Sequence, residues 1–406
     1  MKKALSIILT LMMCLLALAG CSGGGDSSGG SGDEQPGYVI GVIPFADTAA
    51  EQIVWNEYLE EYIGPELNVT FKFVTAPGLD ADAAVTAVEE LKLAGCEGIL
   101  GIVDTPAAIE KANDLGMWFI RSGGLSVEAD QEEIDDLEYY LGSMGPSSED
   151  EYQAAYDMTK YYIDNGSKDI LVYAGMLGLY IPSEMHIQRY QGVIDALEEA
   201  GVKYTLPESG SPVTGPGVGE FDSGDSGLNV SVIYGVNIPG LDDTFVDRLT
   251  QTCSGKTFDA VIMTVEGSQD MSTWLGGLGI TGAKTGEVGS FNPTTTASFN
   301  AGTCDYLVGK YASSMGPAVA ALINAIDGNA DIVKEADGTG SRLIQPFWIA
   351  QSPEEYNEMV EFDNVANPAF NKELVDQYIK RLNPDVTAET FAEFAGMSYD
   401  DLKALR

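Results

Sequence analysis

The stretch Tyr38-Val-Ile-Gly-Val-Ile-Pro44 decides the fold, because an alternation of strands and helices starts from it. The stretch is short, apolar and rich in β-branched residues, which is typical of a strand buried on both faces of a parallel sheet. Residues 48–63 follow, with Trp55, Tyr58 and Leu59 at the spacing of one helical face. We therefore expect a buried strand and then an amphipathic helix, with Trp55 in the core.

The same alternation continues through the first half of the chain. Further strands are predicted at 69–75, 98–103 and 117–120, and helices at 82–94 and 105–115. Gly95 is placed to end the first of these helices as a C-cap. Strands and helices that alternate with short connections specify a parallel sheet with helices on both faces.

The second half repeats the pattern. Strands are predicted at 139–144, 169–173, 230–234, 258–265 and 287–291, and helices at 147–165, 183–200, 242–252 and 268–278. No Gly/Pro linker separates the halves, so we expect strands to join them. The segment Pro207–Gly227, dense in Gly, Ser, Pro and acids, is interpreted as a surface insertion. The chain beyond Pro368 is predicted to be helical, with Ser398 as an N-cap facing Asp401.

Composition limits the classes of protein. A chain of 406 residues with 45% hydrophobic residues is large enough for two domains with buried cores. Its net charge of −41 repels phosphate backbones, so we expect no nucleic-acid partner. The acidic residues are scattered along the chain, and solubility outside the cell accounts for most of them.

The five cysteines and the single histidine exclude several kinds of site. Cys96, Cys253 and Cys304 are an odd set without close spacing, which is neither a disulfide framework nor a zinc site. We expect buried free thiols, with a Cys253–Cys304 bridge as the alternative. One histidine, His186, leaves no multi-histidine metal centre, and we expect no cofactor.

The N-terminus reads as an export signal. Lys2 and Lys3 precede an apolar run, and Leu18-Ala19-Gly20-Cys21 ends it. The run is too short to span a bilayer comfortably. The last four residues resemble the lipobox of bacterial lipoproteins, which implies that Cys21 becomes the acylated N-terminus and holds the chain on the outer side of the cell membrane. An ordinary secretion signal is the alternative. The Gly- and Ser-rich residues 23–32 are predicted to be a flexible tether.

One segment near the end of the second half carries a family resemblance. Residues Cys304–Gly328, CDYLVGKYASSMGPAVAALINAIDG, resemble the type I periplasmic binding proteins, such as the ribose and galactose binders, where a strand crosses the hinge and enters a helix beginning at Met315-Gly316. Two further landmarks are Arg189–Leu197, RYQGVIDAL, and Val288–Asn292, VGSFN. Bacterial repressors share this fold, but the export signal and the lack of an N-terminal DNA-binding head argue against them.

The resemblance implies an α/β fold with two doubly wound parallel-sheet lobes joined by three hinge crossovers. The crossovers are expected near 143–145, 309–311 and 345–347. The implied division is a signal peptide at 1–20, a tether at 21–36, an N-terminal lobe of 37–144 with 311–346, a C-terminal lobe of 145–310 with 347–365, and a helical tail at 366–406. We expect the tail to accompany the C-terminal lobe.

In open α/β sheets, ligands bind beyond the carboxyl ends of the strands, so the residues that leave each strand are the candidates. The predicted ligand-binding residues are Asp47, Thr48, Glu51, Asp104, Arg121, Ser122, His186, Glu266, Asn292, Lys310 and Trp348. Carboxylates, amides and hydroxyls of this kind hydrogen-bond a polyol, and a dry cleft strengthens each bond.

Structural roles are the alternatives for several of these residues. Asp47, Asp104 and Glu184 are also suited to be helix caps or first-turn acids. Arg189 is interpreted as an ion-pair partner, and for His186 an exposed or hydrogen-bonded loop position is favoured over a ligand contact. The chain departs from the ribose binders at Ala50-Glu51, where they have an aromatic pair, and at Gly123-Gly124, where they have Asp-Arg. The ligand is therefore not tied to a pentose or hexose.

The leading hypothesis is a lipid-anchored solute-binding protein that captures a small polar solute, preferably sugar-like, and delivers it to an ABC permease. A cationic or nucleoside-like ligand is the second choice. The alternative function is a sensor that presents its closed form to a receptor kinase. An enzyme is disfavoured by the absence of a nucleophile motif, although Glu51 and Glu266 would suit paired carboxylates if they faced each other across a cleft.

Overall fold

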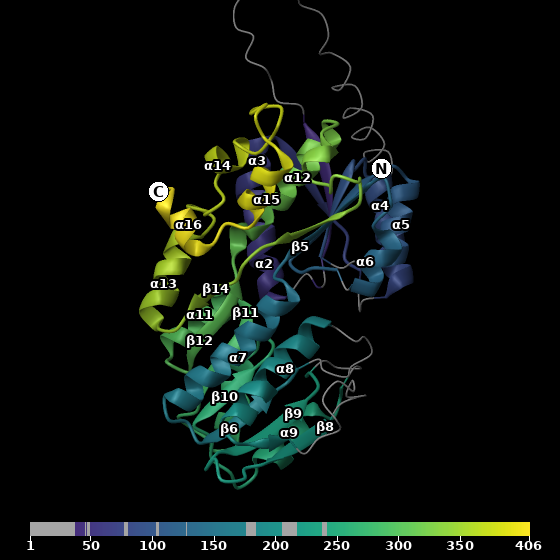
Figure 1. Cartoon of the computed structure of the whole chain (residues 1–406). Coiled ribbons are helices and arrows are strands. Elements are labelled where there is room, and N and C mark those ends of the chain that lie inside the picture. Colours follow the sequence, from purple (N-terminus) through teal and green to yellow (C-terminus); the bar gives the residue numbers. More distant parts are fainter. Residues whose placement is uncertain are drawn as a thin grey trace, which may run out of the picture. The chain divides into compact units, whose positions relative to one another are not determined.

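The structure is a computed structural model, and it describes residues 37–44, 46, 49–76, 80–102, 105–126, 128–175, 184–204, 217–237 and 242–406. The described strands form two separate sheets (Figure 1). The predicted residues Cys21, Asp47, Thr48 and Asp104 lie outside the described part of the chain. No helix within the described residues is long and apolar enough to cross a membrane.

The first sheet has six parallel strands in the order β13-β5-β4-β3-β1-β2. They are β1 (Tyr38–Ile43), β2 (Val69–Phe73), β3 (Gly98–Gly101), β4 (Trp118–Ser122), β5 (Tyr140–Gly145) and β13 (Ser341–Ile344). The first five are the strands predicted from the sequence. The chain adds β2 on one side of β1 and then β3, β4 and β5 on the other side, which is the doubly wound arrangement.

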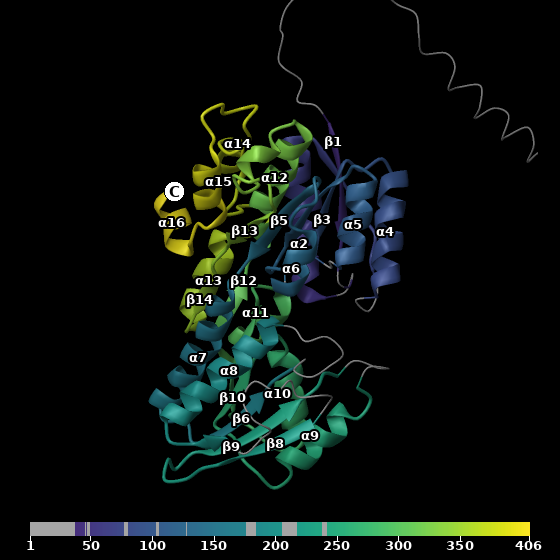
Figure 2. The same ribbon diagram turned by 45° about the vertical axis from the view of Figure 1, so that its right-hand side comes forward.

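Helices cover both faces of the first sheet, as Figure 2 shows. On one face lie α4 (Ala81–Leu93), α5 (Pro106–Asp114) and α6 (Glu128–Ile134), and on the other lie α2 (Ala50–Glu57) and α12 (Gly316–Ile326). Neighbouring strand residues alternate between these layers, since Phe119 packs with the first group and Ile120 with the second. This alternation is the period-two pattern of a strand buried on both sides.

The second sheet has eight strands in the order β14-β12-β11-β10-β6-β9-β8-β7. The parallel strands are β6 (Asp169–Tyr173), β9 (Asn229–Tyr234), β10 (Ala260–Met263), β11 (Lys284–Ser290) and β12 (Cys304–Lys310). Antiparallel neighbours at the two edges are β14 (Trp348–Ala350), β8 (Gly217–Asp222) and β7 (Lys203–Tyr204). Helices α7 (Ser148–Asp164) and α8 (Glu184–Glu199) cover one face, and α9 (Phe245–Cys253) and α10 (Ser268–Gly277) cover the other.

Strand β8 corrects the interpretation of Pro207–Gly227 as a surface insertion. Its residues 217–220 pair with β9 and its residues 221–222 pair with β7, and Phe221 is buried in a core cluster of the second sheet. Residues 205–216 lie outside the described part of the chain.

Three segments pass from one sheet to the other, as the fold prediction requires. They connect β5 to α7, β12 to the 3₁₀ turn η3 (Ala312–Met315), and β13 to β14. The crossing segments are therefore 145–148, 310–312 and 344–348, next to the positions predicted from the sequence. We call each sheet with its helices a lobe, the first lobe holding β1 and the second holding β6.

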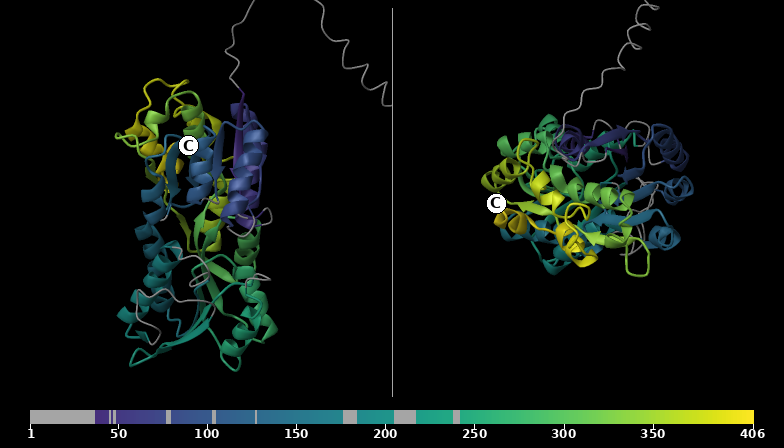
Figure 3. Two further views of the ribbon diagram at one scale, coloured as in Figure 1. Left: turned by 90° about the vertical axis from the view of Figure 1, so that its right-hand side faces the viewer. Right: turned by 90° about the horizontal axis from the view of Figure 1, so that it is seen from above.

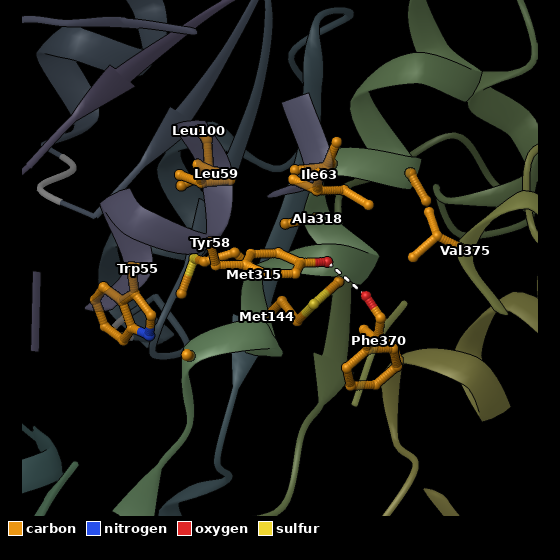
Figure 4. Packing of buried hydrophobic residues seen from close by; sticks show 14 of the residues in the cluster. Trp55, Tyr58, Leu59, Ile63, Leu100, Met144, Met315, Ala318, Phe370 and Val375 are labelled. Atoms are coloured by element: carbon orange, nitrogen blue, oxygen red, sulfur yellow. Dashed lines mark hydrogen bonds between the residues drawn. The ribbon is translucent and has the colours of Figure 1, made fainter. Parts of the chain in front are cut away.

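The helix predicted at 48–63 is divided in three. After α2 the chain makes a π-helical turn, η1 (Tyr58–Ile63), and then the short helix α3 (Gly64–Leu67). Tyr58 is fully buried at this change, and its hydroxyl donates a hydrogen bond of 2.8 Å to the carbonyl oxygen of Phe370 (Figure 4). The π-helical turn thus faces the C-terminal tail.

After β14 comes α13 (Pro353–Phe362), which packs on β14 of the second lobe. The C-terminal tail, residues 366–406, contains α14 (Lys372–Asp376), α15 (Ala388–Ala395) and α16 (Tyr399–Ala404). The predicted cap is confirmed, because the Asp401 backbone N–H donates to the Ser398 hydroxyl at 3.2 Å. The prediction that the tail accompanies the second lobe is wrong: α14 and α15 pack on α12 of the first lobe, and Figure 3 shows the yellow tail at the end that holds the first sheet. Asn324 of α12 causes this in part, since its amide donates to the Tyr378 carbonyl at 2.8 Å and accepts from the Lys380 N–H at 2.7 Å.

The tail, together with Asp363 just before it, contacts the chain at or next to two of the three crossing segments. Asp363 accepts hydrogen bonds from the backbone N–H groups of Ser313, at 3.1 Å, and Ala369, at 2.7 Å. The Ser313 hydroxyl accepts another from the Phe370 N–H at 3.0 Å. Gly396 lies so close to the Ile344 carbonyl oxygen that an added Cβ would be 3.2 Å from it. The tail therefore holds the segments that leave β12 and β13.

The three described cysteines are buried free thiols, as predicted. Cys253 belongs to the core on one face of the second sheet and Cys304 to a different core cluster, so the alternative disulfide does not form.

Candidate functional site

A cleft of about 230 Å³ opens where the carboxyl ends of the first sheet meet the second lobe. The first lobe contributes residues of α2, of β4 and the loop after it, and of β13. The second lobe contributes the first residues of α7 and α8 and the end of β12. This position agrees with the general location of ligands in open α/β sheets.

Trp55 forms an aromatic wall of the cleft. Only 2% of it is exposed, so the prediction that it belongs to the core is confirmed, but its ring also lines the cleft. Its indole N–H donates to the Tyr311 carbonyl at 3.3 Å, which holds the ring against the crossing segment after β12. Gly123 has φ +83°, and an added Cβ would lie 3.0 Å from the Trp55 ring. A glycine is therefore required beside this wall.

Two predicted residues meet across the lobes. Lys310, at the end of β12, places its Nζ 3.5 Å from Oε1 of Glu51 on α2. The same ammonium lies 5.8 Å from the centre of the Trp55 ring, within the range of a cation–π contact. The contact therefore joins the second lobe to α2 at the cleft.

The end of the first sheet supplies two arginines and a serine. Arg121 of β4 and Arg342 of β13 each pair with Ser143 of β5, so the three residues form one row across adjacent strands. Ser122, next along β4, points the other way, and its hydroxyl lies 3.3 Å from the Met315 sulfur. Both arginines and Ser122 line the cleft.

The second lobe adds two carboxylates at helix starts. Glu151 is buried and accepts a hydrogen bond from Arg189 Nε at 2.5 Å, while Arg189 Nη1 donates to the Thr264 carbonyl at 2.8 Å. The interpretation of Arg189 as an ion-pair partner is thereby confirmed. Glu184, the first residue of α8, accepts a hydrogen bond of 3.0 Å from the Ser148 hydroxyl.

His186 is buried on α8 and does not line the cleft, contrary to its predicted ligand contact. Burial, together with the nearby charges of Arg189 and Lys310, lowers the pKa of its imidazole to about 3. His186 is therefore neutral at physiological pH.

Half-buried Glu266 and fully buried Glu287 form an acidic pair, and Glu266 is also affected by the charge of Glu51 in the cleft. Burial, then the charges of Glu287 and Glu51, raise the pKa of Glu266 to about 8, and the Ser290 hydroxyl donates to its carboxylate at 2.8 Å. Burial also raises the pKa of Glu287, whose carboxylate accepts from the N–H groups of Gly267 and Ser268 at 2.8 and 2.9 Å. Glu266, which was predicted to contact the ligand, is not among the residues that line the cleft, although the charge of Glu51, which lines it, acts on Glu266.

The other two predicted contacts have structural roles. Asn292 caps α11 (Pro293–Asn300): its side-chain oxygen accepts from the Thr294 and Thr295 N–H groups at 2.7 and 3.0 Å. Trp348 is 1% exposed, and its ring is stacked on Tyr311 inside the core. Both residues were predicted to contact the ligand, and neither is among the residues that line the cleft.

The structure thus brings together Glu51, Arg121, Ser122 and Lys310 of the predicted set. Sequence reasoning missed Gln52 and Arg342. Gln52 stands beside Glu51 on α2 and is 2% exposed; its amide nitrogen donates to Asn56 at 2.7 Å, while its oxygen has no hydrogen-bond partner among the described residues. Arg342 lies on β13, a strand too short to be recognised in the sequence.

No model of a known protein family matches the chain, and no curated protein matches it either. Solved structures match over most of their length. An ABC transporter solute-binding protein from Bacillus halodurans with bound myo-inositol is 19% identical, with a TM-score of 0.55, and the match covers 80% of this chain and 98% of that one. One from Clostridium phytofermentans with bound β-D-glucose is 13% identical, with a TM-score of 0.55 and coverage of 79% and 96%.

The transcription regulator CcpA of Lactococcus lactis is similar as well, with 14% identity, a TM-score of 0.53 and coverage of 78% and 99%. The chain therefore has the type I periplasmic binding protein fold, which LacI-like regulators share. At these identities the likeness concerns the fold.

Proposed function

We propose that this chain, built on the type I periplasmic binding protein fold, is a solute-binding protein that captures a sugar-sized polar solute between its lobes. The observation that carries the proposal is the cleft itself. It lies at the strand ends, draws residues from both lobes, and combines the Trp55 ring with carboxylates, hydroxyls and cations. An aromatic face with converging polar groups suits a sugar ring, whose faces are apolar and whose edges carry hydroxyls.

Binding is proposed to favour the closed arrangement of the lobes. A solute that contacts Trp55 from one lobe and Lys310 from the other gains most when both lobes touch it, so its presence shifts the population toward closure. No covalent step is assigned to the cleft. The solved structures of this fold named above are binding proteins and a regulator, which supports binding as the activity.

The net charge of −41 favours solute binding over DNA binding, because such a charge opposes contact with phosphates. We further propose that lipid on Cys21 anchors the protein outside the cell membrane and that a permease of the ABC class receives the solute. The motif at Leu18–Cys21 supports the anchor. Metabolic labelling with a fatty-acid analogue tests it: wild type is labelled and Cys21→Ala is not. Labelling of both proteins would refute the anchor.

A ligand screen tests the binding function. Thermal stability of the mature chain is measured with neutral sugars, polyols, sugar acids, sugar phosphates, nucleosides and amino acids, and hits are confirmed by calorimetry. We expect stabilisation by a monosaccharide-sized compound, since a ligand at 100 times its Kd adds about 2.7 kcal/mol to the unfolding free energy. Absence of stabilisation by every class would overturn the proposal.

A matched pair of variants locates the binding site. Lys310 and Lys160 each form an ion pair of 3.5 Å with a glutamate, Lys310 in the cleft and Lys160 on the outer side of α7. We expect Lys310→Met to weaken binding of the hit and Lys160→Met to leave it unchanged. Equal effects of the two variants would place the ligand elsewhere.

Delivery is tested with the same solute in cells. Deleting the gene should abolish uptake of the radiolabelled solute if the partner is a permease. Unchanged uptake, with loss of a transcriptional response to the solute, would instead indicate a receptor kinase as the partner.

A further inference from the structure

We propose that Gln52 is a specificity-determining residue of the cleft. Its side-chain oxygen accepts a hydrogen bond from one hydroxyl of the solute, and Asn56 holds Gln52 in the orientation that this contact requires. The inference rests on the proposed function and deepens it, because it states which chemical group the solute presents to helix α2.

The side-chain oxygen of Gln52 is a buried acceptor without a donor. Gln52 is 2% exposed, and among the described residues no group donates a hydrogen bond to this oxygen. An unpaired buried acceptor destabilises a folded protein, and most buried polar groups have a partner in the protein or in bound water. Because Gln52 lines the cleft, a bound solute can supply the missing donor.

Asn56 determines which end of the Gln52 amide is left for the cleft. The Gln52 amide nitrogen donates a hydrogen bond of 2.7 Å to the side-chain oxygen of Asn56, about one turn further along α2. Asn56 is not among the described residues that line the cleft, whereas Ala49 and Glu51, which precede Gln52 in the chain, are. The nitrogen is therefore occupied by Asn56, and the oxygen is the end that remains for a solute.

The neighbouring Trp55 explains why the donor is a hydroxyl of a ring. Residues three apart on a helix are neighbours, with about 5–6 Å between their Cβ atoms, so Gln52 lies beside Trp55. Both residues line the cleft. A sugar ring that lies against the indole directs the hydroxyls at its edge toward such a neighbour. The Gln52 oxygen only accepts, so it selects a hydroxyl, which donates, over an ether or carbonyl oxygen, which cannot donate.

Analogues of one sugar test the role of Gln52. Calorimetry first ranks D-glucose, D-galactose, D-allose and myo-inositol. The tightest binder is then compared with analogues in which each hydroxyl in turn is replaced by hydrogen or by fluorine. At the hydroxyl that faces Gln52, we expect both replacements to weaken binding about tenfold or more, because each removes the donor and leaves the oxygen of Gln52 unpaired.

The variant Gln52→Met identifies that hydroxyl. It keeps the length of the side chain and removes the acceptor, so the parent sugar should bind about tenfold more weakly, and replacing that hydroxyl by hydrogen should cost no further affinity. Thermal unfolding without sugar should show no loss of stability, since the unpaired buried oxygen is gone.

A matched control is available on another helix. Gln153 of α7 also donates a hydrogen bond of 2.7 Å to a residue four positions further on, Asp157, but it is exposed and does not line the cleft. We expect Gln153→Met to leave the affinity for every analogue unchanged.

Variants of Asn56 test the positioning of Gln52. Asn56→Leu removes the acceptor that holds the Gln52 nitrogen, so the amide is free to turn, and the affinity for the parent sugar should fall about fivefold. Asn56→Asp keeps an acceptor at the same place and should keep the wild-type affinity. Equal affinities of the two variants would refute the positioning role. Both variants retain Gln52, so they decide the question if Gln52→Met does not fold.

The outcomes separate this inference from the proposed function. If every hydroxyl that contributes to binding in the wild type contributes equally in Gln52→Met, the solute is not the partner of this oxygen; the inference is then refuted and the solute-binding function stands. If none of these sugars and polyols binds, the inference is refuted as well, and the wider ligand screen decides separately on the proposed function.

Discussion

The indole ring of Trp348 is stacked on the phenol ring of Tyr311, with ring centroids 3.9 Å apart and ring planes inclined by 14°. The two residues belong to different crossing segments, since Tyr311 follows β12 and Trp348 begins β14. Phe362, at the end of α13, and Tyr399 of the tail contact the same indole, at centroid distances of 6.0 and 5.0 Å. The stack thus joins two crossing segments and the tail in one core.

Trp348→Ala should destabilise the protein rather than impair the cleft. Removing a fully buried tryptophan leaves a large cavity, and the unfolding free energy should fall by about 3–5 kcal/mol. Urea unfolding measures the loss, and Trp348→Phe should lose less. A stable Trp348→Ala protein that no longer binds its ligand would restore the sequence-based hypothesis that this ring contacts the solute.

Removing one partner of the buried Glu151–Arg189 ion pair should lower the unfolding free energy more than removing both partners. Arg189→Met leaves the Glu151 carboxylate buried without its cation, so the unfolding free energy should fall by about 3–5 kcal/mol. Adding Glu151→Gln should recover part of that loss, because the uncompensated charge is gone. The free energies of the two single variants and the double variant form a cycle that measures the coupling. Additive losses would contradict the pairing.

His186 should make the protein less stable in acid. The folded imidazole has a pKa of about 3, whereas the unfolded one has the ordinary value near 6.5, so the unfolded chain binds the extra proton between these pH values. The contribution of His186 to the unfolding free energy is fully present above pH 6.5. Below pH 6.5 the unfolding free energy falls by about 1.4 kcal/mol per pH unit. His186→Asn should flatten this part of the stability profile.

Nuclear magnetic resonance of the untagged protein provides a direct check, because the chain has one histidine. The imidazole signals should not shift between pH 5 and 8. A titration midpoint near 6.5 in the folded protein would show that His186 is solvated.

Gly123→Ala should disturb the cleft more than the fold. Both Gly123, with φ +83°, and Gly166, with φ +88°, adopt the left-handed conformation, so alanine strains either position by about 1 kcal/mol. At Gly166 the added Cβ meets nothing within 4 Å, whereas at Gly123 it meets Trp55. Both variants should therefore lose similar stability, and Gly123→Ala alone should bind its ligand more weakly. Equal affinities by calorimetry would contradict the role of the Trp55 wall.

The sequence predicts the two sheets well because their strands are apolar runs separated by regular helices. It misses β13 and β14, which have four and three residues and no periodicity of their own. It also misplaces the tail, since the contacts of Asn324 with Tyr378 and Lys380 join segments far apart in the chain.

The candidate site is predictable where a residue leaves a strand toward the cleft, as Lys310 does. Trp55 and Trp348 show where prediction from the sequence fails. Helical periodicity identifies Trp55 as buried but does not reveal that this residue also lines the cleft. The position of Trp348 beside a crossing segment does not reveal that its ring is stacked on Tyr311. Such distinctions depend on packing between elements that are distant in the sequence.

The tail has a mechanical consequence for the lobes. Two of the three crossing segments are bound to residues 362–399, and segment 145–148 has none of those contacts. We expect spin labels on α5 and α8 to report a narrower range of distances in the wild type than in Tyr399→Ala; identical distributions would contradict this. If the distributions differ as expected, the lobes separate less beside Tyr311 and Trp348 than on the opposite side of the cleft.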